Sequence, residues 1–285
     1  MVWFSLWVFL TLVTPIWGAG RVEGLYLSFG QDPCTSMQVS WLGGEGRVRA
    51  EYRAMGDRAW REQDGERLER ELPLCRVQLK ALRPDTEYLL RIEGMQGGIR
   101  RFRTMPRALT REVRFVVAGD GLRQRRRFQQ VKERICLAKP DFVVIGGDIA
   151  YAVRGRRSTR GSAAKWRAFV RHWSDARTSE GRLIPLLFVV GNHDAAHHEA
   201  QTFALLAGED RTYRAVDLGG YLSLFLLDTG HVAPLEGAQT RWLGEVLQQR
   251  AQVPCKIAVY HVAAFPSVYS YEGRVLAAVW GLQEI

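Results

Sequence analysis

Short runs of alternating apolar and polar residues dominate the first third of the chain. Residues 37–41 and 48–53 alternate in this way, and residues 88–92 and 99–104 follow turn signals. Several short strands at this spacing are typical of a β-sandwich. We therefore expect an all-β domain over residues 21–107.

The pattern changes after residue 107, where longer apolar runs alternate with amphipathic segments. The apolar runs predict strands at residues 113–118, 141–145, 184–190, 221–227 and 256–260. Segments with helical periodicity lie between some of them, at residues 125–137, 163–173 and 239–249. Strands that alternate with helices indicate βαβ units and a mainly parallel sheet. This pattern predicts a second, α/β domain over residues 110–285.

Polar side chains follow four of these predicted strands. The strand ends read Gly119-Asp120, Gly147-Asp148, Gly191-Asn192-His193-Asp194 and Tyr260-His261. In an α/β sheet, functional groups gather at the carboxyl ends of the parallel strands, so we expect these side chains to converge. Hard oxygen ligands with one imidazole suit iron, manganese or zinc better than calcium. The sequence therefore predicts a metal site at this edge of the sheet.

The order of these motifs resembles that of the calcineurin-like metallophosphoesterases, and within them the purple acid phosphatases. That family carries a Gly-Asp motif, a Gly-Asp-x-x-Tyr motif, a Gly-Asn-His-Asp/Glu motif and then a single His. The matching residues in this chain are Asp120, Asp148 with Tyr151, Asn192 with His193, and His261. Residues 36–41 and 82–88 also resemble a strand and the tyrosine corner of the fibronectin type III-like domain that precedes the catalytic domain in purple acid phosphatases.

The resemblance implies an N-terminal fibronectin type III-like sandwich followed by an α/β metallophosphoesterase domain, which is a layered α-β-β-α sandwich. It also implies two metal ions, iron with zinc, manganese or a second iron. Asp148 would bridge them, with Asp120 and Tyr151 on one ion and Asn192 and His261 on the other.

Two histidines are candidates for contact with the substrate. The resemblance implies that His193, beside the ligand Asn192, donates a proton or contacts the phosphate. His231 lies just past the predicted strand 221–227, and we expect it to line the pocket.

The expected activity is the hydrolysis of phosphate monoesters by a water that the metal pair activates, with a phosphorylated small molecule as substrate. A phosphodiesterase or nucleotide phosphohydrolase with the same site is a second interpretation. A third is a catalytically inert, truncated relative that acts as a binding module. The family takes its last two ligands from a Gly-His-x-His motif, and no histidine follows His261. We therefore expect the domain to be incomplete at its C-terminal end.

The composition narrows the possible partners. Lys and Arg outnumber Asp and Glu by 40 to 30, which gives a net charge of +10. A basic surface raises the encounter rate with phosphates, nucleic acid or anionic lipid. No recognition helix or stacking platform accompanies the arginines, so specific nucleic-acid binding is not expected.

The first residues predict export. Residues 1–20 are largely apolar, contain no charged side chain and end in Gly18-Ala19-Gly20. Such a segment is typical of a secretory signal peptide, so we expect a secreted or periplasmic protein with no membrane contact after cleavage. In an oxidising compartment Cys34 and Cys75 either pair or remain buried thiols. The sequence leaves that choice and the oligomeric state open.

Overall fold

The computed structural model describes residues 22–69, 72–121, 124–153, 162–174, 176–195 and 199–263. The expected signal peptide, residues 1–20, lies outside the described residues, and so do the Arg-rich stretch 154–160 and residues 264–285. Among the described helices, none has both the length and the hydrophobicity needed to cross a bilayer.

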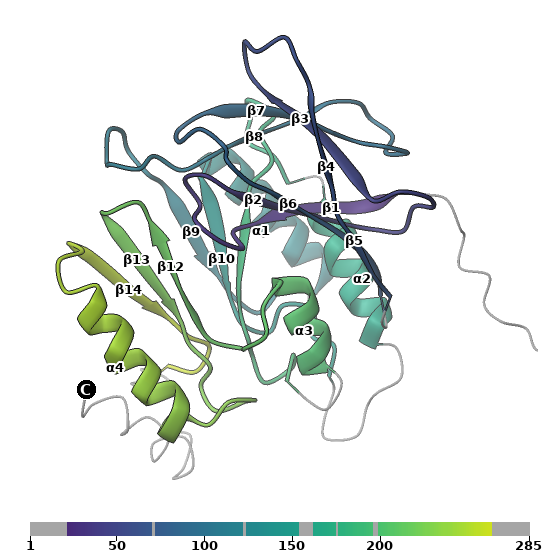
Figure 1. Cartoon of the computed structure of the whole chain (residues 1–285). Helices are drawn as coiled ribbons and strands as arrows, with labels where there is room; N and C mark the ends of the chain where they lie inside the picture. The colour runs from purple at the N-terminus through teal and green to yellow at the C-terminus, as the bar shows by residue number, and fades with distance from the viewer. Residues whose placement is uncertain are drawn as a thin grey trace, which may run out of the picture.

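The N-terminal part is the predicted β-sandwich (Figure 1). One sheet has the strand order β5-β6-β2-β1 and the other the order β4-β3-β7-β8. Their bounds are β1 (Glu23–Ser28), β2 (Met37–Leu42), β3 (Arg49–Ala54), β4 (Arg61–Asp64), β5 (Glu66–Glu69), β6 (Pro73–Leu79), β7 (Glu87–Ile92) and β8 (Arg100–Arg103). The tyrosine corner is confirmed, because the Tyr88 hydroxyl accepts the Arg83 backbone N–H at 2.7 Å.

The C-terminal part has two sheets with helices outside them (Figure 1). Three parallel strands, in the order β11-β10-β9, form the first sheet, and β12-β13-β14 form the second. The strands are β9 (Phe115–Ala118), β10 (Phe142–Gly146), β11 (Leu186–Val189), β12 (Arg214–Leu218), β13 (Leu222–Leu226) and β14 (Cys255–Val259). The helices are α1 (Arg125–Ala138), α2 (Ser162–Trp173), α3 (Glu199–Ala207) and α4 (Thr240–Gln249), with the short turn η2 (Leu235–Gln239) before α4.

Side chains that point alternately to the two faces of a strand pack into the layers on either side of the sheet. In β10, Val143 and Ile145 pack in one apolar cluster with residues of α1 and α2. The intervening Phe142 and Val144 pack on the opposite face, in a cluster with residues of β12 and β13. Successive side chains of a strand point to opposite faces, so β10 is buried on both sides. Leu243 and Val246 of α4 pack against Phe225 on the outer face of β13. The expected α-β-β-α layering is therefore confirmed.

The sandwich and the α/β part share one sheet. Strand β1 pairs in parallel with β11 at Ser28 and Leu186, so seven strands run continuously in the order β5-β6-β2-β1-β11-β10-β9. Helix α2 lies against β1 as well, and Arg171 forms a 2.7 Å ion pair with Glu23. The sequence pattern predicts two successive domains, whereas hydrogen bonds and packing join them in the structure.

All four cysteines are free thiols. Cys34 and Cys75 are buried, and their sulfurs donate to the backbone oxygens of Pro106 and Gly43 at 3.3 and 3.4 Å. Of the two possibilities that the sequence leaves open, the structure has the buried thiols.

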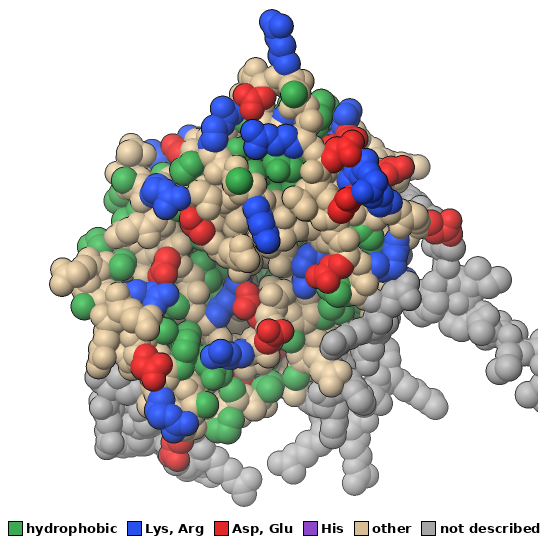
Figure 2. All heavy atoms as spheres, in the orientation of Figure 1, with side chains coloured by type: hydrophobic (Ala, Val, Ile, Leu, Met, Phe, Trp, Pro, Cys, Tyr) green, Lys and Arg blue, Asp and Glu red, His purple; other side chains and the backbone are tan. Residues whose placement is uncertain are grey.

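Positive and negative side chains are mixed over the surface. Figure 2 shows Lys and Arg interspersed with Asp and Glu over one face of the molecule. Among the described residues, Lys and Arg therefore form no continuous basic patch on this face.

Candidate metal centre

The proposed ligands lie at one edge of the two sheets. Asp120, Asp148 and Asn192 follow the carboxyl ends of β9, β10 and β11, which are parallel neighbours. His261 follows β14, and its ring contacts Gly146 at the end of β10. The predicted convergence of the strand ends is therefore present.

Three of the proposed ligands have an unusual backbone conformation. The φ angles are +53° at Asp120, +51° at Asp148 and +49° at Tyr151. Side chains other than glycine rarely adopt this left-handed region, and such residues gather at functional sites where the surrounding structure holds them. The turns after β9 and β10 also bond to each other, because Asp120 N donates to Gly147 O at 3.1 Å.

Two glycines allow the close approach of the loops. Gly147 has φ +90°, and a Cβ there would lie 2.3 Å from Nδ1 of His261. A Cβ on Gly191 would lie 2.2 Å from the backbone nitrogen of Asp148. These glycines of the motifs therefore make room for the ligands of the neighbouring strands.

The protonation of His261 follows from its hydrogen bonds. Its Nδ1 lies 2.9 Å from the carbonyl oxygen of Gly146, which only accepts, so Nδ1 carries the proton. In the neutral form of the ring, Nε2 presents a lone pair. That nitrogen lies 3.0 Å from Oδ1 of Asn192 and 3.4 Å from Oδ1 of Asp148. Three electron-rich atoms therefore face one another, and a cation between them would relieve the repulsion.

Asp148 is a buried carboxylate. It is 3% exposed, and its Oδ1 accepts the backbone N–H of His193 at 2.8 Å. Its Oδ2 lies 3.9 Å from Nε2 of His193. A carboxylate buried this deeply requires compensating charge or further hydrogen bonds, which a metal ion would supply.

Tyr151 completes the arrangement at the end of β9. Its hydroxyl donates to Oδ1 of Asp120. Burial raises the pKa of the phenol well above its usual range, and the bond to Asp120 and the charges of Asp120 and Asp148 raise it further. Without a cation the phenol therefore stays protonated, and a bound metal would reverse this preference.

His193 lies beside Tyr151 and stays accessible. The two rings stack with centroids 4.6 Å apart. Nδ1 of His193 lies 2.6 Å from the carbonyl oxygen of Val153, so this nitrogen carries a proton and Nε2 is left free. The side chain is 33% exposed, which leaves it within reach of a substrate.

Asp194 holds the loops after β10 and β11 together, a role that the sequence does not reveal. Its fully buried carboxylate accepts the backbone N–H of Ile149 at 3.0 Å and that of Gly191 at 3.2 Å. Burial raises the pKa of Asp194 to about 8, while these hydrogen bonds act in the opposite direction. Asp194 therefore joins the loops that carry Asp148 and Asn192.

Asp228 holds the loop that carries His231. The buried Asp228 carboxylate accepts the backbone N–H groups of His231, Val232 and Ala233 at 2.8 to 3.1 Å. The ring of His231 lies 5.6 Å from that of His261, edge to face. Burial lowers the pKa of His231, so the neutral ring is favoured. His231 therefore borders the proposed ligands.

The donor set is mixed. Among the described residues, no group of three or more His, Cys, Asp or Glu side chains is close enough to hold a metal ion. Two of the five proposed donors, Tyr151 and Asn192, are of other types, and each contacts a neighbouring donor directly. Carboxylate, phenol, amide and imidazole together suit a hard or borderline cation such as iron, zinc or manganese.

Comparisons with known proteins agree with this architecture. The family model of the calcineurin-like phosphoesterases matches residues 113–284. No curated protein sequence matches the chain.

Two solved structures share the fold. One is a purple acid phosphatase, PPD1, from yellow lupin (Lupinus luteus) seeds, with a TM-score of 0.69 and 15% identity over 87% of this chain. The other is PhoD, with a TM-score of 0.59 and 12% identity over 89% of this chain. The matches cover 52% of the lupin chain and 64% of the PhoD chain, so this chain spans between half and two thirds of their lengths. On the family match and the arrangement of its strand ends, the chain belongs to the calcineurin-like phosphoesterase family.

Proposed function

We propose that the chain hydrolyses phosphate monoesters at a two-metal centre. The ligands would be Asp120, Asp148, Tyr151, Asn192 and His261. The observation that carries this proposal is the position of His261 Nε2, which lies 3.0 and 3.4 Å from oxygens of Asn192 and Asp148.

The proposed ligands would fall into two sets. Tyr151 donates a hydrogen bond to Asp120 on one side, and Nε2 of His261 lies 3.0 Å from Oδ1 of Asn192 on the other. Asp148 contacts His261 and adds to the negative charge around Tyr151, so it would bridge the two ions. The phenol of Tyr151 favours trivalent iron on its side, with zinc, manganese or iron on the other.

The bound metal pair would supply positive charge for the phosphate and lower the pKa of a water to near neutrality. The residues of the chain complete the chemistry. His193 has its Nδ1 proton fixed by Val153, so only Nε2 can exchange a proton with a substrate. We propose that Nε2, when protonated, donates to the leaving oxygen. His231 would contact a phosphate oxygen from the other side.

Two chromogenic substrates test this proposal. The full chain, supplied with iron, zinc and manganese, is assayed with p-nitrophenyl phosphate and with bis(p-nitrophenyl) phosphate. We expect faster turnover of the monoester and loss of turnover in Asp148→Asn. The matched control is Asp210→Asn, since Asp210 is an exposed carboxylate outside the ligand set. Faster turnover of the diester would replace the proposal with the phosphodiesterase interpretation, and turnover that Asp148→Asn leaves unchanged would exclude this metal centre.

A further inference from the structure

Lys165 lies in the first turn of α2, where a positive charge is unfavourable. Helix α2 begins at Ser162, and the partial positive charge of a helix N-terminus repels a nearby cation. The first turn of α2 contains no acidic residue that would offset the charge. The helix itself therefore gives no reason for a lysine at this position.

The ammonium group of the half-buried Lys165 reaches the turn that follows β10. Its Nζ donates to the carbonyl oxygen of Tyr151 at 2.6 Å and to that of Ala152 at 3.4 Å. Hydrogen bonds from a charged donor are stronger than those between neutral groups. Lys165 therefore ties α2 to the residue whose phenol is a proposed ligand.

The backbone at Tyr151 needs such a hold. Its φ angle is +49°, a left-handed conformation that persists only where the surrounding structure fixes it. Two residues further on, the backbone bonds to the loop after β11, because Val153 N donates to His193 O at 3.0 Å. The bonds from Lys165 fix the two carbonyl groups that precede this contact.

The position of the backbone determines where the phenol lies. The ring of Tyr151 stacks on that of His193, with centroids 4.6 Å apart, and its hydroxyl donates to Asp120. The groups that fix the backbone of a ligand also hold its side chain in place. Loss of the bonds from Lys165 would therefore loosen the ring from both partners.

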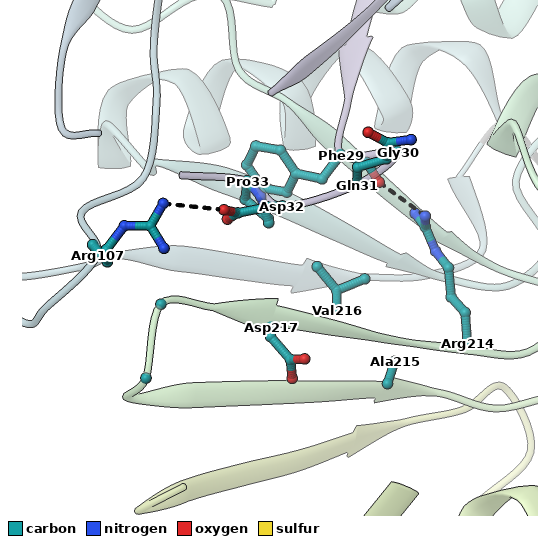
Figure 3. A pocket seen from close by; sticks show the side chains of 12 residues that line it. Phe29, Gly30, Gln31, Asp32, Pro33, Arg107, Arg214, Ala215, Val216 and Asp217 are labelled. Carbon is teal, nitrogen blue, oxygen red and sulfur yellow. Dashed lines mark hydrogen bonds and ion pairs between the residues drawn. The ribbon is translucent and has the colours of Figure 1, made fainter. Parts of the chain in front are cut away.

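Other cations also donate to backbone carbonyls, at positions away from the proposed ligands. Figure 3 shows Arg214 bonded to the backbone oxygen of Phe29, at 2.8 Å, in a cavity that none of the proposed ligands lines. Lys256 donates to the carbonyl oxygens of Ala251 and Val253, at 3.1 and 2.6 Å. Lys256 is therefore a matched comparison, a lysine that bonds to two carbonyls outside the proposed centre.

We propose that Lys165 is a positioning residue for the metal centre, which it orients through the backbone of Tyr151. This inference rests on the proposed function, in which the phenol of Tyr151 binds a metal ion. Tyr151 and Asp120 form one of the two ligand sets, so Lys165 would act on the ion held there. Asn192 and His261, in the other set, follow different strands.

Titration of the metal-free full chain with iron(III), supplied as its citrate complex, tests the proposal. Iron(III) bound by a phenolate absorbs visible light, so Tyr151→Phe should abolish the absorption band. We expect Lys165→Met to weaken the apparent iron affinity about 10-fold to 100-fold, as is usual when a group that orients a metal ligand is lost. Lys165→Arg can donate to the same carbonyls and should restore most of the affinity. Lys256→Met should leave the affinity unchanged.

Hydrogen exchange of the metal-free protein distinguishes this proposal from the proposed function. The N–H of Val153 should exchange faster in Lys165→Met than in the unchanged protein or in Lys256→Met, because the turn is no longer held. Equal iron affinity in Lys165→Met, or equal exchange at Val153, would overturn the role of Lys165 and leave the metal centre standing. Absence of the band from the unchanged protein would contradict the metal centre itself, and the role of Lys165 there with it.

Discussion

The contacts of His193 leave one ring nitrogen, Nε2, for the proposed proton donation. Val153 fixes the proton on Nδ1, and the ring of Tyr151 limits its rotation. We expect His193→Asn to lower kcat for a phosphate monoester by about 10²-fold to 10⁴-fold, the range for loss of a general acid. The metal content should not change, because His193 is not a proposed ligand.

His172 on α2 provides the control for this substitution. Its ring contacts Phe128, outside the ligand set, so His172→Asn should leave kcat nearly unchanged. Steady-state kinetics with elemental analysis of each variant measures both effects. An unchanged kcat in His193→Asn would show that another group donates the proton.

Cys34 is predicted to be an unreactive thiol. Burial, with the charge of Asp32, raises its pKa to about 11. At pH 8 only about a thousandth of such a thiol is thiolate, and each pH unit up to about 11 raises that fraction roughly tenfold. Iodoacetamide should therefore modify the exposed Cys255 long before Cys34, as followed by mass spectrometry of peptides.

Labelling in urea without a reductant is the control for Cys34. Unfolding should expose all four thiols to the reagent, whereas a disulfide between Cys34 and Cys75 would protect both. Rapid labelling of Cys34 in the folded protein would contradict its burial.

At the scale of elements, α2 packs on the central sheet that both parts of the chain share. Trp166, Phe169, Val170 and Trp173 are each at most 3% exposed and face the central sheet. Phe169 contacts Phe128 on α1 and Phe188 on β11, with ring centroids 5.9 and 6.1 Å away. Phe169→Ala should lower the free energy of unfolding by about 3 to 5 kcal/mol.

Leu137→Ala on α1 is the matched control, since Leu137 is 66% exposed. Urea unfolding followed by circular dichroism should show a change of no more than about 0.5 kcal/mol for this variant. Equal loss of stability in Phe169→Ala and Leu137→Ala would mean that α2 does not pack as described.

Elements with strong periodicity could be predicted from the sequence. The helix expected at residues 125–137 is α1 (Arg125–Ala138), and the one expected at 163–173 is α2 (Ser162–Trp173). Strand β12 (Arg214–Leu218) cannot be predicted from the sequence pattern, because it is a short edge strand that contains two charged residues. Its existence depends on pairing with β13 and on the cluster beneath it.

Three residues of the candidate site can be predicted because their motifs are local in sequence. Each motif combines a strand with the residues directly after it, so local sequence places Asp120, Asp148 and Asn192. The roles of Asp194 and Asp228 could not be predicted, because they depend on backbone groups that only the folded loops bring to them.

At the scale of the whole molecule, the continuous seven-stranded sheet joins the sandwich to the site. The pairing of Ser28 with Leu186 connects segments far apart in the chain, and no local pattern encodes it. Strand β11, which carries Asn192 at its end, is therefore fixed from both sides. The sandwich would thus help to hold one proposed ligand in place.

Metal stoichiometry of the full chain tests the central claim most directly. The protein is purified after growth with iron, manganese and zinc, beside Asp148→Ala and the exposed control Asp210→Ala. We predict about two ions per chain in the unchanged protein and in Asp210→Ala, and their loss in Asp148→Ala. Metal near zero in all three, or metal that Asp148→Ala retains in full, would contradict the two-metal centre.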